Sequence, residues 1–176
     1  RDRLVPYLAD AYPDPTGDAA QAPLVSAASF AELSACEQEI LTAAAPLIQT
    51  RIQLLRECRD MLGFLFVSDD DLIIDDRART KLKASAGDVL DAGIHALEGI
   101  AAEQWGRDHL EEALKDAIVE GRGMPDGEGI KPRLAYGPLR VAVTGRQVSP
   151  PLFESMEILG ADSTLARLRA LRDQLG

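Results

Sequence analysis

Hydrophobic residues recur three and four positions apart along most of the chain, and this spacing predicts helices. No stretch of useful length alternates apolar and polar residues as a strand would, and no internal repeat is visible. The predicted fold class is therefore all-α, with two packed helical subdomains that form a helical bundle. An acidic turn separates them, so the first is expected to span residues 1–75 and the second residues 76–176.

The first part of the chain carries several helix-start signals. Residues 1–8 are expected to form a short helix, whereas closely spaced prolines and a glycine in residues 10–28 predict a loop. Residues 29–32 and 34–37 both match the Ser-x-x-Glu capping box, so one of them should begin a helix that ends near Ala45.

Pro46 is expected in the first turn of a new helix, where its missing N–H has no intrahelical partner to lose. The apolar residues of 47–55 would form one face of that helix, and Arg51 lies off this face in a window without acidic residues. A dense apolar block at 61–66 predicts a short buried helix that is interrupted at Gly63.

The second part of the chain is also expected to be helical, apart from a glycine-rich loop at 121–129. The aspartates of 69–76 are expected to cap helices, because this run lacks the glycine and the glutamate that a calcium loop requires. Six helices are predicted here. The first spans 78–83, the second begins at Ser85 or Asp88, and the third begins at Asp108. The fourth runs from Pro138 to Gly145, the fifth begins at Ser149 and Pro150, and the sixth runs from Thr164 to Leu175 after a cap at Asp162 or Ser163.

Composition and charge narrow the class of protein. With 46% hydrophobic and 27% charged residues, the 176-residue chain has the composition of a globular protein. No apolar run is long enough for a membrane helix, and the first residues lack a Met and a signal peptide, so a piece cut from a longer protein is expected. Two cysteines fit an intracellular, cytoplasmic protein with free thiols. A net charge of −10 argues against a sequence-blind nucleic-acid binder.

The sequence offers no catalytic residue and no set of metal ligands. The glycines of 121–129 are not followed by the Lys-Ser/Thr pair of a phosphate loop. His95 and His109 are fourteen positions apart and have no Cys or His at metal spacing around them. The chain by itself is therefore predicted to be a binding module and not a catalyst.

One segment departs from the acidic balance of the chain. Residues 130–153 contain four basic and no acidic residues, so a face built from them could hold phosphates despite the net charge of −10. Small, apolar and aromatic residues at 149–153 then begin a helix, which suits phosphates or unstacked bases. The alternative is a solvated arginine face over a core that includes Leu152 and Phe153, and composition alone favours this alternative.

The same segment resembles the C-terminal signature of bacterial-type glutamyl-tRNA synthetase. It has Lys131, then Gly-Pro-Leu-Arg-Val-Ala-Val-Thr-Gly at 137–145 and Ser-Pro-Pro-Leu-Phe-Glu at 149–154. Upstream, Pro-Leu-Ile-Gln-Thr-Arg-Ile at 46–52 is similar to the first anticodon-binding subdomain of that family. The resemblance covers residues 32–175.

The resemblance implies an excised anticodon-binding region of a class I enzyme that attaches glutamate to its tRNA using ATP and magnesium. The nucleotide-binding motifs of the catalytic Rossmann domain do not occur in this sequence, so the fragment itself should be inactive and need no cofactor. Its expected partner is the anticodon loop of glutamate tRNA, with no membrane and no DNA, and it is expected to be a monomer.

The resemblance also assigns the site residues. Arg51 would read the third anticodon base and help to reject glutamine tRNA, which has G in place of C there. The anticodon pocket would be formed by Arg140, Ser149, Pro150, Leu152 and Phe153.

Two alternatives stay open. One is a non-discriminating enzyme that also charges glutamine tRNA, against which Arg51 argues. The other is an acidic all-α protein-interaction module with no RNA role. Protein-binding helices should present a wide exposed apolar groove, whereas RNA-binding helices should bring Arg51, Arg140 and Arg146 to one side.

Overall fold

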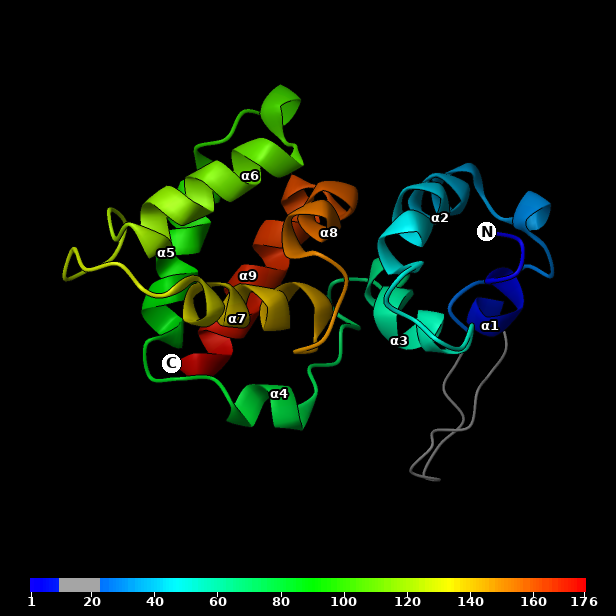
Figure 1. Ribbon diagram of the computed structural model, residues 1–176, viewed down its shortest axis with the longest axis horizontal. Coiled ribbons are helices and arrows are strands. Elements are labelled where there is room, and N and C mark those ends of the chain that lie inside the picture. Colours follow the sequence, from blue (N-terminus) through cyan, green and yellow to red (C-terminus); the bar gives the residue numbers. More distant parts are fainter. Residues whose placement is uncertain (10–22) are drawn as a thin grey trace. The chain divides into compact units, whose positions relative to one another are not determined.

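The computed structural model describes residues 1–9 and 23–176, and over these residues the chain is helical and has no strand (Figure 1). The predicted all-α class is confirmed. The loop predicted for 10–28 lies outside the described residues except for 23–28, which are not helical. The helices form two compact units, Arg1–Ser68 (unit 1) and Asp69–Gly176 (unit 2), and each is described by itself.

Unit 1 packs short helices around an aliphatic core. Its helices are α1 (Val5–Ala9), the 3-10 turn η1 (Phe30–Glu32), α2 (Ala35–Ile48), α3 (Glu57–Leu62) and the 3-10 turn η2 (Gly63–Leu65). The largest fully buried side chains of this unit are Leu8, Leu41, Ile48 and Leu62. The predicted interruption at Gly63 is confirmed, because α3 ends directly before it.

Ser34 decides where α2 begins. Its hydroxyl accepts a hydrogen bond from the Glu37 backbone N–H (3.3 Å), and the Glu37 carboxylate accepts one from the Ser34 backbone N–H (2.8 Å), which completes a capping box. The competing Ser29 makes no side-chain cap bond, and only a single 3-10 turn follows it. The second of the two predicted capping boxes is therefore the one that starts the helix.

The prediction that Pro46 begins a new helix is wrong. Pro46 lies in the last turn of α2, which continues to Ile48, and turns follow. A proline inside a helix removes one backbone hydrogen bond, but Ala44 and Ile48 on either side of it are buried, so packing holds this turn together. The apolar residues of 47–55 therefore share no helical face, and Leu54 is left 48% exposed.

The two cysteines of unit 1 differ in environment, and this difference predicts a loss of stability at alkaline pH. Cys36 is exposed, whereas Cys58 in α3 is fully buried, and burial raises the pKa of the Cys58 thiol from 9.0 to about 11. The folded protein keeps this proton at pH values where the unfolded chain loses it, so the free energy of unfolding falls as pH rises from 9.0 towards 11. At a pH of about 10 we expect a loss of about 1 kcal/mol.

Urea unfolding at neutral pH and at a pH of about 10 measures this loss. The Cys58→Ala variant is the control, because it lacks the titrating thiol and should lose less stability over the same interval. Equal losses in the two proteins would show that another group is responsible.

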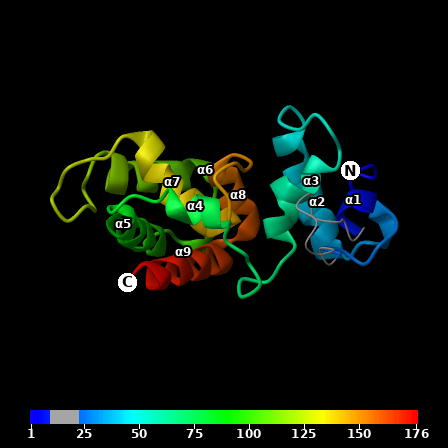
Figure 2. The same ribbon diagram turned by 90° about the horizontal axis from the view of Figure 1, so that it is seen from below.

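Unit 2 is a helical bundle around a second core. Its helices are α4 (Asp76–Thr80), α5 (Ala86–Glu98), the 3-10 turn η3 (Ala102–Gln104), α6 (Arg107–Leu114), the π-helical turn η4 (Lys115–Val119), α7 (Pro132–Thr144), α8 (Leu152–Leu159) and α9 (Ala161–Leu175). Helix α5 packs on α9 and α7, and α6 packs on α8 (Figure 2). Gly93 allows the close approach of α5 to α7, because a Cβ there would lie 2.9 Å from Leu139 Cδ2.

Helix α7 is longer than predicted. It begins at Pro132, and Pro138, the predicted start, lies inside it. Either proline suits the first turn of a helix, and buried residues on both sides of Pro138, Ala135 and Leu139, keep the helix continuous through it. The predicted end at Gly145 is confirmed.

The last two helices also begin at other residues than predicted. Helix α8 begins at Leu152 and not at the Ser149 cap, because the Ser149 hydroxyl donates to the Pro150 carbonyl (2.9 Å) and caps no helix. Helix α9 begins at Ala161, directly after Gly160, so its first turn includes the predicted caps. The chain thus turns between α8 and α9 at a single glycine with a φ of +86°.

The segment before α4 is fastened to unit 2. Asp69 accepts a hydrogen bond from Nε of Arg167 (2.6 Å), whose side chain is buried. The Asp75 backbone N–H donates to the Gly145 carbonyl (2.9 Å), and the Asp75 carboxylate caps α4 by accepting from the Arg77 N–H (2.7 Å), as expected for this acidic run. Because of these bonds residues 69–75 belong to unit 2, although the acidic turn predicted that they would end the first subdomain.

Candidate nucleic-acid interface

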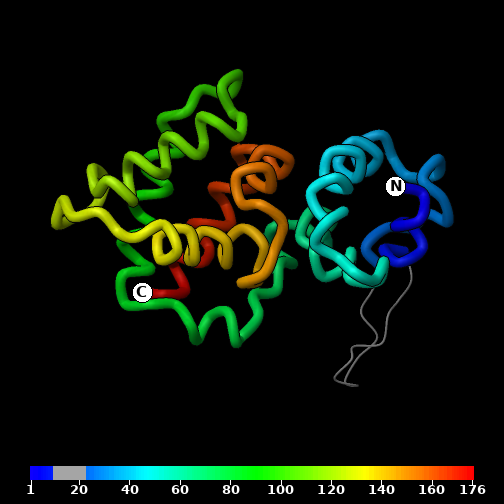
Figure 3. The backbone as a smooth tube through the Cα atoms, viewed as in Figure 1, coloured from blue at the N-terminus to red at the C-terminus, as the bar shows by residue number. Residues whose placement is uncertain are grey.

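Arg140 and the turn between α7 and α8, drawn in orange in Figure 3, form one hydrogen-bonded corner of unit 2. Nη1 of Arg140 donates to Ser149 Oγ (2.5 Å) and to the Pro150 carbonyl oxygen (2.8 Å). The structure therefore brings three of the predicted pocket residues together. The three residues are joined because the guanidinium group of Arg140 donates hydrogen bonds to the turn.

The C-terminal end of α7 fixes the other side of this turn. Thr144 Oγ1 donates to the Arg140 carbonyl (2.8 Å) and accepts from the Arg146 backbone N–H (3.3 Å). Gly145 then takes a left-handed φ of +71°, which ends the helix. The turn is thus held at both ends and presents a fixed surface to a ligand.

Apart from Arg140, the predicted pocket residues are largely covered by protein. Ser149 and Leu152 are each 4% exposed, and Pro150 is also buried. Phe153 is partly buried, and its ring meets the Tyr136 ring edge-on, with centroids 5.3 Å apart and an interplanar angle of 84°. Leu152 thus lies in the core, as the alternative from composition expected, while Arg140 and Phe153 stay partly exposed.

A groove of about 750 Å³ opens beside this corner, between α7 and the connection from α4 to α5. The cationic residues that line it are Lys81, Lys83, Arg133 and Arg140. No carboxylate is among the described residues that line it, and Leu134 and Val148 in the same lining are 47% and 74% exposed. The groove therefore combines positive charge with exposed apolar side chains, and grooves that bind single-stranded nucleic acid combine positive charge with apolar, mainly aromatic, surfaces.

The two lysines of this groove are not among the site residues predicted from the sequence. Lys81 and Lys83 are far from the acid-free segment 130–153 in the sequence. Nothing in the sequence therefore predicts that they share a surface with it. A signal was present, since residues 77–87 also contain four basic and no acidic residues. Nζ of Lys81 donates to Gln147 Oε1 (3.1 Å), which links this segment to the turn after α7.

Tyr136 also lines the groove, in addition to its contact with Phe153. Burial, and to a lesser degree the neighbouring Glu111, raise the pKa of the Tyr136 phenol above its ordinary value. The phenol therefore stays protonated at neutral pH, adds no negative charge to the groove and keeps a hydrogen-bond donor.

Arg51, the residue expected to read a base, lies in unit 1. Its backbone N–H donates to the Ile48 carbonyl (2.9 Å) in the turn after α2, and its side chain is exposed. Its neighbours in this turn line a groove of about 590 Å³ that also contains Arg1 and Arg3 and no carboxylate. Because Arg51 and Arg140 belong to different units, their approach to one RNA loop stays a prediction.

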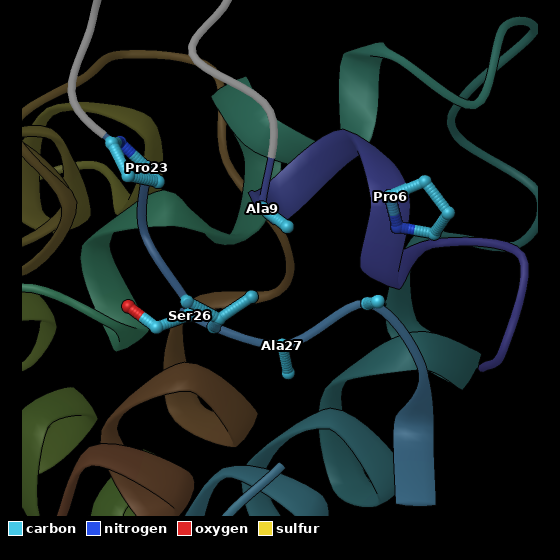
Figure 4. Close-up of a pocket in the computed structure, with 7 residues that line it drawn as sticks. Pro6, Ala9, Pro23, Ser26 and Ala27 are labelled. Atoms are coloured by element: carbon cyan, nitrogen blue, oxygen red, sulfur yellow. The ribbon is translucent and has the colours of Figure 1, made fainter. Parts of the chain in front are cut away.

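Other features of the described residues do not suggest a different kind of site. A pocket of about 460 Å³ lies between α1 and residues 23–28, and Figure 4 shows Pro6 and Ala9 of the helix across from Ser26 and Ala27. Among the described residues that line this pocket none is charged, so they offer no cation to a phosphate. Within residues 1–9 and 23–176, no helix is long and apolar enough to cross a membrane. In the same described residues, no group of three or more His, Cys, Asp or Glu side chains could hold a metal ion.

Sequence comparisons match the chain to synthetases of bacteria. The family model described as the anticodon binding domain matches residues 3–172. Glutamate–tRNA ligases of Clavibacter michiganensis and Bifidobacterium adolescentis are 49% identical over 174 residues and 51% identical over 152 residues. These matches cover 99% and 86% of this chain but only 30% and 29% of the two ligases, so the chain spans less than a third of their length.

Solved structures share the fold. A glutamate tRNA ligase of Elizabethkingia meningosepticum matches 83% of this chain with a TM-score of 0.63 and 16% identity, over 27% of its own length. A glutamate–tRNA synthetase of Elizabethkingia anophelis matches 81% with a TM-score of 0.54 and 16% identity, over 25% of its length. Because the family model spans nearly the whole chain, the chain belongs to the anticodon-binding domain family.

Proposed function

We propose that this chain is the anticodon-binding region of a glutamate–tRNA ligase and that it binds the anticodon loop of glutamate tRNA. The family match and the names of the relatives that are about half identical support this proposal. The observation that carries it is the groove of unit 2, which gathers cations and exposed apolar side chains and has no carboxylate in its lining.

The groove suits a single-stranded RNA loop for physical reasons. Cations that neutralise phosphates release counterions from the RNA, and this favours binding even though the net charge of the chain is −10. Unstacked bases can stack on aromatic side chains, of which Tyr136 lines the groove, and each stack of a base on an aromatic ring contributes about 1–3 kcal/mol. The bonds from Arg140 to the turn fix this surface before the RNA arrives, so little conformational entropy is lost on binding.

In this proposal the chain recognises tRNA and does not catalyse its charging. We infer that ATP, magnesium and the Rossmann catalytic domain, which the family resemblance implies, belong to the part of the ligase that this chain does not span, since the chain covers only 30% of the Clavibacter michiganensis ligase. The exposed guanidinium of Arg51 can present two donors to the acceptor edge of a base, which suits the reading of one anticodon position. We place the protein in the cytoplasm as a monomer, and its free thiols at Cys36 and Cys58 fit a reducing compartment.

A protein-interaction module is the other candidate function. Such a module would present a wide apolar groove to a partner helix. In unit 2 the exposed Leu134 and Val148 instead share a groove with four cations, and this mixture favours RNA.

The chain is expected to bind glutamate tRNA with an affinity that falls steeply as salt rises. Fluorescence anisotropy of a labelled transcript, titrated at several ionic strengths, measures both the affinity and its salt dependence. An affinity that is indifferent to salt would contradict the electrostatic part of the proposal, and a lack of binding at low salt would refute the proposal itself.

Replacement of Arg51 by glutamine is expected to reduce discrimination between glutamate and glutamine anticodons in the full-length ligase. The loss should be about 1 kcal/mol or more, the lower bound for one mismatched base, if RNA behaves as DNA sites do. Aminoacylation efficiency on two tRNAs that differ only at the third anticodon base measures it. Arg56→Gln is the matched control, because Arg56 is exposed in the same unit and the substitution removes the same charge. Unchanged discrimination in Arg51→Gln would remove the role assigned to Arg51.

A further inference from the structure

The connection from α4 to α5 brings two lysines to the groove that the start of α7 lines. Lys81 and Lys83 come from this connection and Arg133 from the first turn of α7, and all three side chains are exposed. Arg140 also lines this groove, from the later part of α7, whereas the other predicted pocket residues follow α7 and are not among its lining residues. The three residues, called the groove cations below, are not among the predicted site residues.

The groove cations differ from five other cations of unit 2, each of which pairs with a carboxylate. These pairs are Lys115 with Glu120, Arg107 with Glu154, Arg122 with Asp116, Arg169 with Glu98, and Arg172 with Asp91. Within the described residues, no carboxylate pairs with a groove cation, and Lys81 contacts only the neutral Gln147 amide. Like charges that share a groove without a counter-charge repel one another, so an anion bound there would be stabilised.

We propose that Lys81, Lys83 and Arg133 bind backbone phosphates of the RNA strand that flanks the anticodon, whatever its sequence. This inference rests on the proposed function and adds a backbone site to it. A lysine ammonium is a point charge that suits a phosphate oxygen, and phosphate contacts position a strand without reading its bases. The groove cations would thus set the register in which the anticodon meets the rest of the surface.

The apolar residues of the same groove favour RNA over an acidic peptide. Leu134 and Val148 are the exposed large hydrophobic side chains of this lining. A strand of phosphates and planar bases matches both the cations and these apolar side chains, whereas a purely acidic peptide matches the cations alone. The acidic peptide is therefore the competing occupant that the experiment must exclude.

The test compares two triple variants of this chain in tRNA titrations at several salt concentrations. The groove variant is Lys81→Gln, Lys83→Gln and Arg133→Gln; the control is Lys115→Gln, Arg122→Gln and Arg169→Gln, which removes the same charge from ion-paired surface sites. Each phosphate contact on a single strand contributes about 0.7 to the slope of log affinity against log salt, so the groove variant should lose about 2 from this slope. That corresponds to about a hundredfold weaker binding at about 0.1 M salt.

The loss should be equal for glutamate tRNA and for a transcript altered at the third anticodon base. The control variant should keep the slope of the unsubstituted chain, and the circular dichroism of all three proteins should agree. If the unsubstituted chain binds no tRNA, the proposed function fails. If it binds and the groove variant keeps its affinity and slope, or loses affinity for one anticodon only, the backbone site is wrong while the proposed function stands. Equally tight binding of a poly-glutamate peptide would replace RNA by an acidic peptide as the occupant.

Discussion

An Arg140→Gln variant is expected to lose about 2–4 kcal/mol of the free energy of unfolding of unit 2. Nη1 of Arg140 donates to Ser149 Oγ and to the Pro150 carbonyl, and both acceptors belong to buried residues of the turn between α7 and α8. Hydrogen bonds from a charged donor each contribute about 1.5–3 kcal/mol, but these two share the single atom Nη1 and so contribute less than their sum; a shortened neutral side chain cannot span the same distance. The turn would then lose the bonds that fix its shape.

The same variant is expected to bind tRNA more weakly than the loss of one charge explains, because the surface around the turn is no longer fixed. Denaturant unfolding and tRNA titration on the same protein measure the two effects. Arg133→Gln is the matched control, since Arg133 is also on α7 and lines the same groove, but it is exposed and makes no ion pair within the described residues. The control should keep its stability and lose only the electrostatic part of the affinity. An Arg140→Gln variant as stable as its parent would show that the turn does not depend on these bonds.

A Gly145→Ala variant is expected to lose about 3 kcal/mol or more of its free energy of unfolding. This total exceeds the cost of about 1–2 kcal/mol for placing a non-glycine residue in the left-handed conformation. Gly145 has a φ of +71°, and a Cβ built there falls close to the backbone carbonyl oxygen of Ile73. Main-chain atoms cannot move aside as a flexible side chain can. The segment before α4 would have to shift, and this shift would weaken or break the hydrogen bond from the Asp75 N–H to the Gly145 carbonyl.

Gly127→Ala provides the control for this prediction. Gly127 has a φ of +70° but no atom within 4 Å of the position of a Cβ, so its variant pays only for the backbone conformation. The difference between the two variants in urea unfolding isolates the close approach of Ile73 to the end of α7. Equal losses would mean that this segment is not pressed against the helix end in solution.

Local signals predicted the elements whose ends depend on local bonds. The Ser34 capping box, the Asp75 cap and the helix end at Gly145 all involve residues within a few positions of one another, so their pattern is visible in the sequence. Two of the errors came from prolines. Pro46 and Pro138 have the residue type of a helix start, but buried neighbours carry the helix through them.

The candidate site shows the same division between local and distant information. The acid-free segment 130–153 and the family resemblance led to Arg140 and the turn that follows it. Burial of Leu152 and Ser149, and the inward bonds of Arg140, depend on packing against distant helices, and no local pattern encodes them. The four basic residues and the lack of acidic residues at 77–87 can be read from the sequence. That two of these basic residues line the same groove as Arg140 cannot be read from it.

The sequence by itself determined the helical class, the family resemblance and the presence of acid-free basic segments in an acidic chain, because periodicity, capping and composition are properties of neighbouring residues. Only the tertiary structure decided which of these segments meet. It placed Lys81 and Lys83 in one groove with Arg133 and directed Arg140 into the turn after α7. These segments come close in space because buried helix faces pack against one another, and such packing brings together residues that are far apart in the sequence.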